Sequence, residues 1–128
     1  VVYRLEGGGV QALFLGDLGV EGGERLLSLY GDTLASDMVQ MAHHGQNGVD
    51  RPVYEAIRPD ICLWPTPSWL WDNVPGSGYN TGIWKTLCVR AWMRGLGAKR
   101  HVVSKDGDFR LTCQNGNVQI EKISFTES

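Results

Sequence analysis

Two short apolar stretches of this chain each end at side chains that bind metal ions or protons. Residues 12–15 (Ala-Leu-Phe-Leu) are followed, after one glycine, by Asp17. Residues 38–42 (Met-Val-Gln-Met-Ala) are followed directly by His43 and His44. Both stretches are apolar enough to form strands inside a sheet, and in α/β sheets ligands gather at the carboxyl ends of such strands. The sequence therefore predicts that Asp17, His43 and His44 face one crevice.

The other predicted elements alternate between strands and helices, which is typical of an α/β fold. Glycines at positions 7–9 predict a hairpin between two opening strands, and Asp50 with Pro52 marks the start of a helix. Strands are predicted at residues 1–6, 10–15, 38–42 and 61–64, and helices at 24–30, 51–57 and 83–96. Strands at 101–104, 109–113 and 118–124, separated by Asp-Gly and Asn-Gly turns, predict a C-terminal antiparallel meander. The predicted fold class is therefore α/β, with a mixed sheet, covering helices and this meander.

The size of the chain, 128 residues, is that of one domain, and we expect residues 1–128 to form a single one. The chain begins inside a predicted strand without an initiator Met, so we expect further chain upstream. No apolar run approaches the roughly 20 residues that cross a bilayer. Cys62, Cys88 and Cys113 are far apart and lack a Cys-x-x-Cys pair, so we expect a reduced, cytoplasmic protein.

The net charge of −2 conceals an asymmetry between two parts of the chain. Residues 1–80 carry ten acidic and four basic side chains, whereas residues 81–128 carry four acidic and eight basic ones. The basic part, which includes Lys85 and Arg90, either attracts an anionic substrate or is an ordinary solvated surface. Because the basic residues do not cluster as they do in nucleic-acid-binding domains, we do not expect this chain to bind nucleic acid.

Histidine and carboxylate side chains are the ligands that a water-activating divalent metal needs. Taken on the residues alone, however, Gly-Asp is also a common turn, and His-His-Gly also suits a loop at the entry to a helix. The chain has three histidines, and we expect His101, at the start of a late strand, to be structural. A complete two-metal site therefore cannot be built from these residues alone.

Several motifs resemble the C-terminal half of the metallo-β-lactamase superfamily, and most closely its ComEC/Rec2-type hydrolases. These motifs are Leu-Gly-Asp, a short Glu-rich helix, Ala-Ser-Asp-Met-Val-Gln-Met-Ala-His-His-Gly and Tyr-Glu-Ala-Ile-Arg-Pro-Asp. The resemblance covers residues 1–64 and resumes more weakly at 95–108. It implies half of an αββα sandwich, so that residues 1–128 would be the C-terminal part of a larger domain.

The resemblance also implies a metal-dependent hydrolase, in which metal-activated water attacks an ester or a phosphodiester. The matching aspartate of that family bridges two metal ions, which assigns Asp17 as the bridge between two zinc ions, with manganese or iron as alternatives. A histidine of the family's His-His-Gly motif binds one of these ions, which implies His44 or His43 as that ligand. Adjacent residues at a strand end point to opposite sides, so we do not expect both to bind the same ion. We favour His44 as the ligand and His43 as a catalytic proton donor or oxyanion partner. The family's upstream His-x-His-x-Asp-His motif has no match in residues 1–16, so we expect this piece to be inactive alone.

The segment from residue 65 to residue 82 departs from the resemblance and allows a different function. Its prolines, glycines and tryptophans follow no regular period, so we expect a long ordered loop. Trp69, Trp71, Tyr79 and Asn80 are candidates for binding a small-molecule or phosphodiester substrate. Alternatively, this loop serves a non-enzymatic interaction or oligomerisation domain, which would bind a partner protein or a second copy of the chain.

Overall fold

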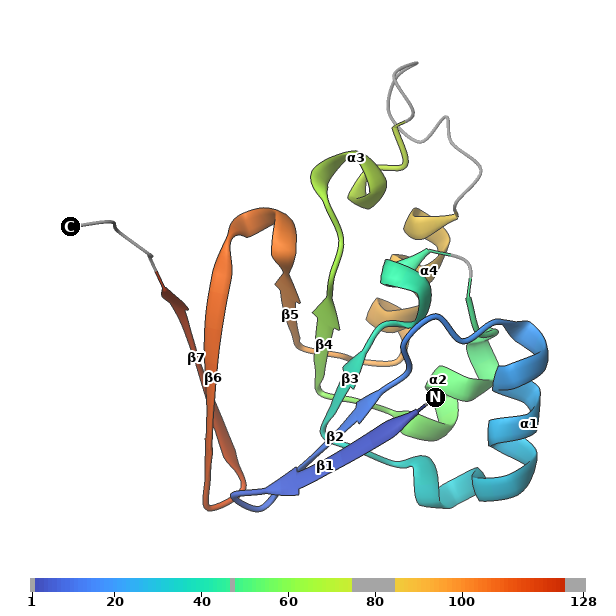
Figure 1. The fold of residues 1–128 in the computed structure, drawn as a ribbon, viewed down its shortest axis with the longest axis horizontal. Helices are drawn as coiled ribbons and strands as arrows, with labels where there is room; N and C mark the ends of the chain where they lie inside the picture. Colours follow the sequence, from blue (N-terminus) through green and yellow to red (C-terminus); the bar gives the residue numbers. More distant parts are fainter. Residues whose placement is uncertain (1, 47, 75–84, 124–128) are drawn as a thin grey trace.

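A five-stranded mixed sheet forms the centre of the computed structural model, which describes residues 2–46, 48–74 and 85–123 (Figure 1). The strands lie side by side in sequence order: β1 (Tyr3–Gly7), β2 (Val10–Phe14), β3 (Met38–Gln40), β4 (Ile61–Trp64) and β5 (Arg100–Val103). β1 and β2 form an antiparallel hairpin, whereas β2, β3, β4 and β5 run parallel to one another. The carboxyl ends of four strands therefore meet at one edge of the sheet.

Helices cover one face of this sheet (Figure 1). The α-helices of the described chain are α1 (Val20–Tyr30), α2 (Arg51–Ile57), α3 (Ser68–Trp71) and α4 (Thr86–Gly95). Short 3-10 helices lie at Gly31–Leu34, Ala42–Gly45 and Ser104–Asp106. α1 packs against α2, and α2 packs against α4. The core beneath them consists of fully buried side chains, among them Val39, Met41, Tyr54, Trp64 and Met93. Within the described ranges, no helix is long and apolar enough to span a membrane.

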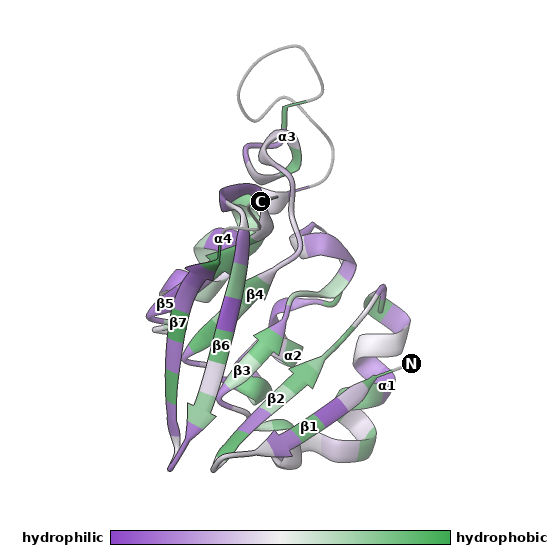
Figure 2. Ribbon diagram, turned by 60° about the vertical axis from the view of Figure 1, so that its left-hand side comes forward, coloured by the Kyte–Doolittle hydropathy of each residue, from purple (hydrophilic) through white to green (hydrophobic). Residues whose placement is uncertain are grey.

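A second sheet of two antiparallel strands packs on the opposite face. Its strands are β6 (Asp108–Gln114) and β7 (Asn117–Ile123), along which half-buried and exposed residues alternate for most of their length. Hydrophobic and hydrophilic residues likewise follow one another along these strands (Figure 2). Their inward side chains, which include Leu111, Val118 and Ile120, pack against Val10, Ala12, Met38 and Ile61 of the main sheet. The layers are therefore helices, main sheet and second sheet. This arrangement confirms the predicted α/β class with a mixed sheet, covering helices and a C-terminal antiparallel pair.

The first helix begins at Val20, four residues earlier than the sequence predicted. Its first turns contain Gly22 and Gly23, and glycine disfavours a helix when only local preference is considered. Gly23 is buried, and a Cβ atom at this position would lie 2.8 Å from Cγ1 of Val49. The close approach of α1 to the chain at Val49 therefore requires a glycine inside the helix.

The predicted meander is wrong in one strand, because β5 belongs to the main sheet. β5 pairs in parallel with β4, as a strand can do when a helix such as α4 connects the two. The chain then passes from the main sheet to the second sheet around Gly107, which has a φ of 120°. The Asn115-Gly116 turn does join paired strands, and φ is 54° and 80° at these two residues, as a tight hairpin turn requires.

Other predicted elements agree with the structure. The opening hairpin, the helix at 51–57 and the strand at 61–64 are confirmed. The strand predicted at 38–42 is shorter, because β3 ends at Gln40 and the chain turns immediately afterwards. Residues 83 and 84 of the predicted helix, and residues 75–82 of the predicted loop, lie outside the described residues.

Candidate metal centre

The chain segments that follow β2 and β3 are tied together by hydrogen bonds. Gly16 has a φ of 61°, a left-handed conformation that glycine adopts without strain. Its amide donates a hydrogen bond of 3.2 Å to Oε1 of Gln40, and its carbonyl accepts one of 2.8 Å from the amide of His43. These bonds bring Asp17, the next residue after Gly16, to the same edge of the sheet as the two histidines.

The two histidines lie in a left-handed turn rather than on a strand. In this segment, Ala42–Gly45, which we call the histidine turn, φ and ψ are 52° and 48° at His43 and 59° and 21° at His44. A residue other than glycine held in such a conformation costs about 1–3 kcal/mol, and it persists only where neighbouring contacts hold it. The expectation that His43 and His44 point to opposite sides assumed an extended strand, and therefore does not apply here.

Two buried hydroxyl groups hold the histidine turn. The hydroxyl of Tyr54 accepts a hydrogen bond of 3.2 Å from the amide of Ala42. Burial raises the pKa of Tyr54 well above its ordinary value, so this hydroxyl stays neutral. The hydroxyl of Thr66, a residue with no exposed surface, donates to the carbonyl of His44. The strained backbone is therefore supported from α2 on one side and from the end of β4 on the other.

The imidazole of His44 is oriented by a second contact from the end of β4. Its Nδ1 lies 2.9 Å from the carbonyl oxygen of Pro65. Because a carbonyl only accepts, Nδ1 carries the proton, and Nε2 of the neutral ring keeps a lone pair. Nε2 lies 4.0 Å from Oδ1 of Asp17. The side chains of His44 and Asp17 are 54% and 81% exposed, so solvent and small ligands reach both.

This arrangement has the chemistry of a metal-binding pair. Metal-bound histidines generally donate their second ring N–H to a carbonyl or carboxylate, which fixes the tautomer. Two donors that bind one ion at roughly 2.0–2.2 Å lie about 3–4 Å from each other, close to the separation of Nε2 of His44 and Oδ1 of Asp17. Within the part of the chain that the structure describes, no group of three or more His, Cys, Asp or Glu side chains is placed to hold a metal ion. Asp17 and His44 therefore fit a partial ligand set.

Asp17 and His44 lie in a segment that matches a known protein. The chain is similar to the competence protein ComA of Neisseria gonorrhoeae. The two are 28% identical over 124 residues, which is 95% of this chain but 16% of the length of ComA. No family model matches the chain. The similarity to ComA agrees with the resemblance to ComEC/Rec2-type proteins that the sequence motifs indicated. Membership of the metallo-β-lactamase superfamily stays a prediction.

The proposed catalytic role of His43 also stays a prediction. Its side chain is half-buried, and its Cβ lies close to Gly48, where an added Cβ would come within 3.2 Å. The amide of His43 donates to the carbonyl of Gly16, so its backbone is held by a hydrogen bond as well.

The predicted substrate-binding residues are placed differently from one another. Trp69 on α3 is 51% exposed. Trp71, two residues further along α3, turns inward and meets the ring of Trp64 edge to face, with 5.0 Å between the ring centroids. Tyr79 and Asn80 lie outside the described residues. A substrate-binding role for these four residues stays a prediction.

Sequence reasoning did not identify Pro65, Thr66 or Tyr54 as supports of the histidine turn. Pro65 and Thr66 directly follow the predicted strand at 61–64, so their position at the same edge as Asp17 was a usable signal. Tyr54 carried no comparable signal, because its hydroxyl reaches Ala42 only through the packing of α2 against the sheet.

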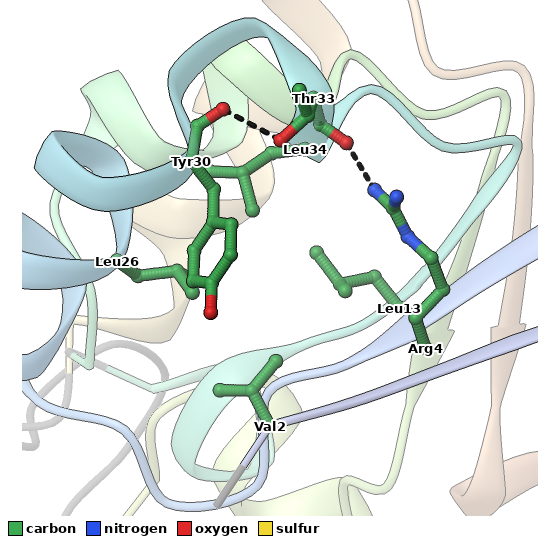
Figure 3. A pocket seen from close by; sticks show the side chains of 7 residues that line it. All are labelled: Val2, Arg4, Leu13, Leu26, Tyr30, Thr33 and Leu34. Carbon is green, nitrogen blue, oxygen red and sulfur yellow. Dashed lines mark hydrogen bonds between the residues drawn. The ribbon is translucent and has the colours of Figure 1, made fainter.

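Another cavity, of about 440 Å³, lies between the β1–β2 hairpin and α1 (Figure 3). It is lined by Val2, Arg4, Leu13, Leu26, Tyr30, Thr33 and Leu34. Arg4 donates to the carbonyl of Thr33, and the hydroxyl of Thr33 donates to the carbonyl of Tyr30 at 2.7 Å. The described lining contains no His, Cys, Asp or Glu, so this cavity has less catalytic chemistry than the edge that carries Asp17 and His44.

Proposed function

We propose that this chain supplies Asp17 and His44 to the metal centre of a hydrolase that cleaves ester or phosphodiester bonds. The observation that carries the proposal is the orientation of His44, whose Nδ1 is held by Pro65 while Nε2 faces Oδ1 of Asp17 at 4.0 Å. A ring held in this way keeps the Nε2 lone pair directed at one point, as a metal ligand requires. An ordinary surface ion pair contributes little to stability and would not need a strained left-handed backbone.

The proposed centre would hold two zinc ions, or manganese or iron in their place, and such bound ions would supply an activated water molecule. Asp17 has two carboxylate oxygens and would bind both ions, whereas His44 would bind one of them through Nε2. His43 would donate a proton to the leaving oxygen as a general acid. The histidine turn would keep both rings in position before the substrate arrives.

The similarity to ComA adds a biological setting to this proposal. That protein is named a competence protein, and we propose that this chain is part of a protein with a related role. The chain spans only 16% of ComA, so we propose that the remaining metal ligands come from outside residues 1–128. Cys62, Cys88 and Cys113 are all free thiols, which is compatible with the proposed cytoplasmic location.

Zinc titration tests the proposed site directly. NMR signals of the His44 ring should shift as zinc is added to the chain. Asp17→Ala and His44→Ala should each weaken zinc binding by more than about tenfold. A loss of about tenfold in metal affinity is already typical when only the group that hydrogen-bonds a metal ligand is removed, and removal of the ligand itself costs more. Calorimetry measures the affinity, and elemental analysis after gel filtration measures the zinc that remains bound.

Asp32→Ala and His101→Gln are the matched controls, because they change the same residue types away from the proposed ligands. Asp32 is exposed just beyond the C-terminal end of α1, and His101 accepts a hydrogen bond from Trp64. Both controls should bind zinc as the wild type does. Unchanged zinc affinity in the Asp17→Ala, His44→Ala double variant would mean that the ion is held elsewhere, and the proposal would be wrong. Because the remaining ligands are proposed to come from outside residues 1–128, the full-length protein is titrated as well, and His44 signals that do not respond to zinc there would have the same consequence.

A further inference from the structure

A cavity of about 260 Å³ lies beside α4 and the strands β4 and β5. The side chains that line it are Trp64, Trp71, Arg90, Arg94 and His101, which are all aromatic or cationic. The candidate metal ligands do not line it, so the cavity is separate from the candidate metal centre. Trp64 nevertheless lies next to both the cavity and the histidine turn. Its ring packs so closely on Gly45 of that turn that an added Cβ there would lie 2.4 Å from the ring.

Two indole rings form firm apolar walls for this cavity. Trp64 and Trp71 meet at an interplanar angle of 89°, and Trp64 is 1% exposed. Nε1 of Trp64 donates a hydrogen bond of 3.0 Å to Nδ1 of His101. Because an indole N–H only donates, this nitrogen of His101 is unprotonated and the imidazole is neutral. His101 therefore holds Trp64 in place, in keeping with its expected structural role.

Two arginines of α4 give the cavity a positive potential. Arg90 lies over the ring of Trp71, 4.1 Å from the centroid, and its charge is partly offset by Asp72 at 3.7 Å. Arg94, one helical turn further along, is exposed and lines the cavity. Burial lowers the pKa of His101, a hydrogen bond with the backbone of Ala98 opposes this shift, and the charges of Arg94 and Arg90 add smaller lowering contributions. A field that disfavours a proton at His101 favours an anion in the adjoining space.

We propose that this cavity binds an oxyanion, either a phosphate or a carboxylate, that is attached to a flat apolar group. The guanidinium of Arg94 would pair with the oxyanion, because its planar set of N–H donors matches two oxygens at once. The apolar group would lie against Trp64 and Trp71, which favour aromatic contacts. The cavity is smaller than typical pockets for drug-sized ligands, so the occupant is about one ring with its anionic group. This inference does not depend on the proposed metal centre.

Titration with three ring compounds tests the proposal. Phenyl phosphate and benzoate carry the two candidate oxyanions on the same ring, and phenol lacks an oxyanion. The protein is first freed of metal on a chelating resin, so that no compound binds through a metal ion at Asp17 and His44. The readout is the NMR signal of the indole N–H groups of Trp64 and Trp71, assigned from Trp→Phe variants. We expect saturable shifts with at least one acid, at lower concentration than with phenol, and the acid that binds identifies the oxyanion.

Arg94→Gln is the deciding variant, because this exposed side chain is removed without disturbing the buried core. Loss of the charge-assisted hydrogen bonds from Arg94 predicts at least about tenfold weaker binding of the acid. Arg94→Lys keeps the charge and should have an intermediate affinity. Arg25→Gln makes the same charge change on the exposed surface of α1, and should bind as the wild type does.

Three outcomes would overturn the proposal. If phenol saturates the two indole signals at the same concentration as the acids, the cavity recognises an apolar ring alone. If neither acid moves these signals, the cavity binds neither oxyanion. If Arg94→Gln and Arg25→Gln weaken binding equally, the acids respond to the overall charge of the chain and not to this site.

Discussion

A single hydroxyl group, that of Thr66, supports the backbone of His44 in its left-handed conformation. It donates a hydrogen bond to the carbonyl of His44. The carbonyl of Pro65, the residue before Thr66, accepts a hydrogen bond from Nδ1 of His44. Two adjacent residues thus determine both the backbone and the ring orientation of the candidate ligand. We expect Thr66→Val, which keeps the shape and removes the hydroxyl, to lower the free energy of unfolding by about 1 kcal/mol, because the partly buried carbonyl of His44 loses this hydrogen bond.

The same Thr66→Val variant should also weaken zinc binding at His44 by about tenfold, the usual effect of losing a group that orients a metal ligand. Urea unfolding measures the first effect, and zinc titration by NMR measures the second. Thr66→Ser retains the hydroxyl and should recover most of the zinc affinity. If the Ser variant loses as much zinc affinity as the Val variant, a retained hydroxyl does not preserve the site, and the hydrogen bond from residue 66 is not what orients His44.

Among the elements, the turns of two hairpins touch and help to join the second sheet to the main sheet. The carbonyl of Gly8, between β1 and β2, accepts a hydrogen bond of 2.8 Å from the amide of Gly116, between β6 and β7. A Cβ at Gly8 would lie 2.1 Å from the carbonyl oxygen of Cys113, and φ at Gly8 is 58°. We expect Gly8→Ala to lower the free energy of unfolding by at least about 1–2 kcal/mol, the penalty of a left-handed residue with a Cβ.

Urea unfolding measures this loss, and amide hydrogen exchange in β6 and β7 shows whether these strands separate first. Gly7→Ala is the matched control, because a Cβ at Gly7 would meet no atom within 4 Å. The control should change stability much less than Gly8→Ala. If Gly7→Ala and Gly8→Ala lower the free energy of unfolding equally, the contact between the two turns contributes nothing to stability.

At the scale of the whole molecule, the reactivity of the Cys62 thiol tests whether the core between the sheet and its covering layers excludes solvent. Cys62 is fully buried in β4, and burial raises the pKa of its thiol to about 12. Cys88 on α4 is exposed. Alkylation requires both access and a thiolate, so iodoacetamide at neutral pH should modify Cys88 first and Cys62 only when denaturant opens the core. Mass spectrometry of peptides measures both sites, and equal rates in the native protein would contradict a closed core.

Local chemistry accounts for the elements that the sequence predicted correctly. Pro52 suits the first turn of a helix, and the Asn115-Gly116 pair suits a tight hairpin turn, so their neighbours adopt these structures with little help from distant residues. The shared edge of Asp17 and His44 was predictable as well, because each follows a buried strand and the strands run parallel.

The sequence by itself determined most of the local elements and indicated which candidate metal ligands lie at one edge. Only the tertiary structure decided that β5 pairs with β4, that α1 includes Gly23, and that His44 adopts a left-handed backbone. The physical reason is that each of these features depends on contacts between segments far apart in the chain, such as the hydroxyl of Thr66 with the carbonyl of His44. Burial and hydrogen bonding at such contacts outweigh the local preferences that a sequence pattern reports.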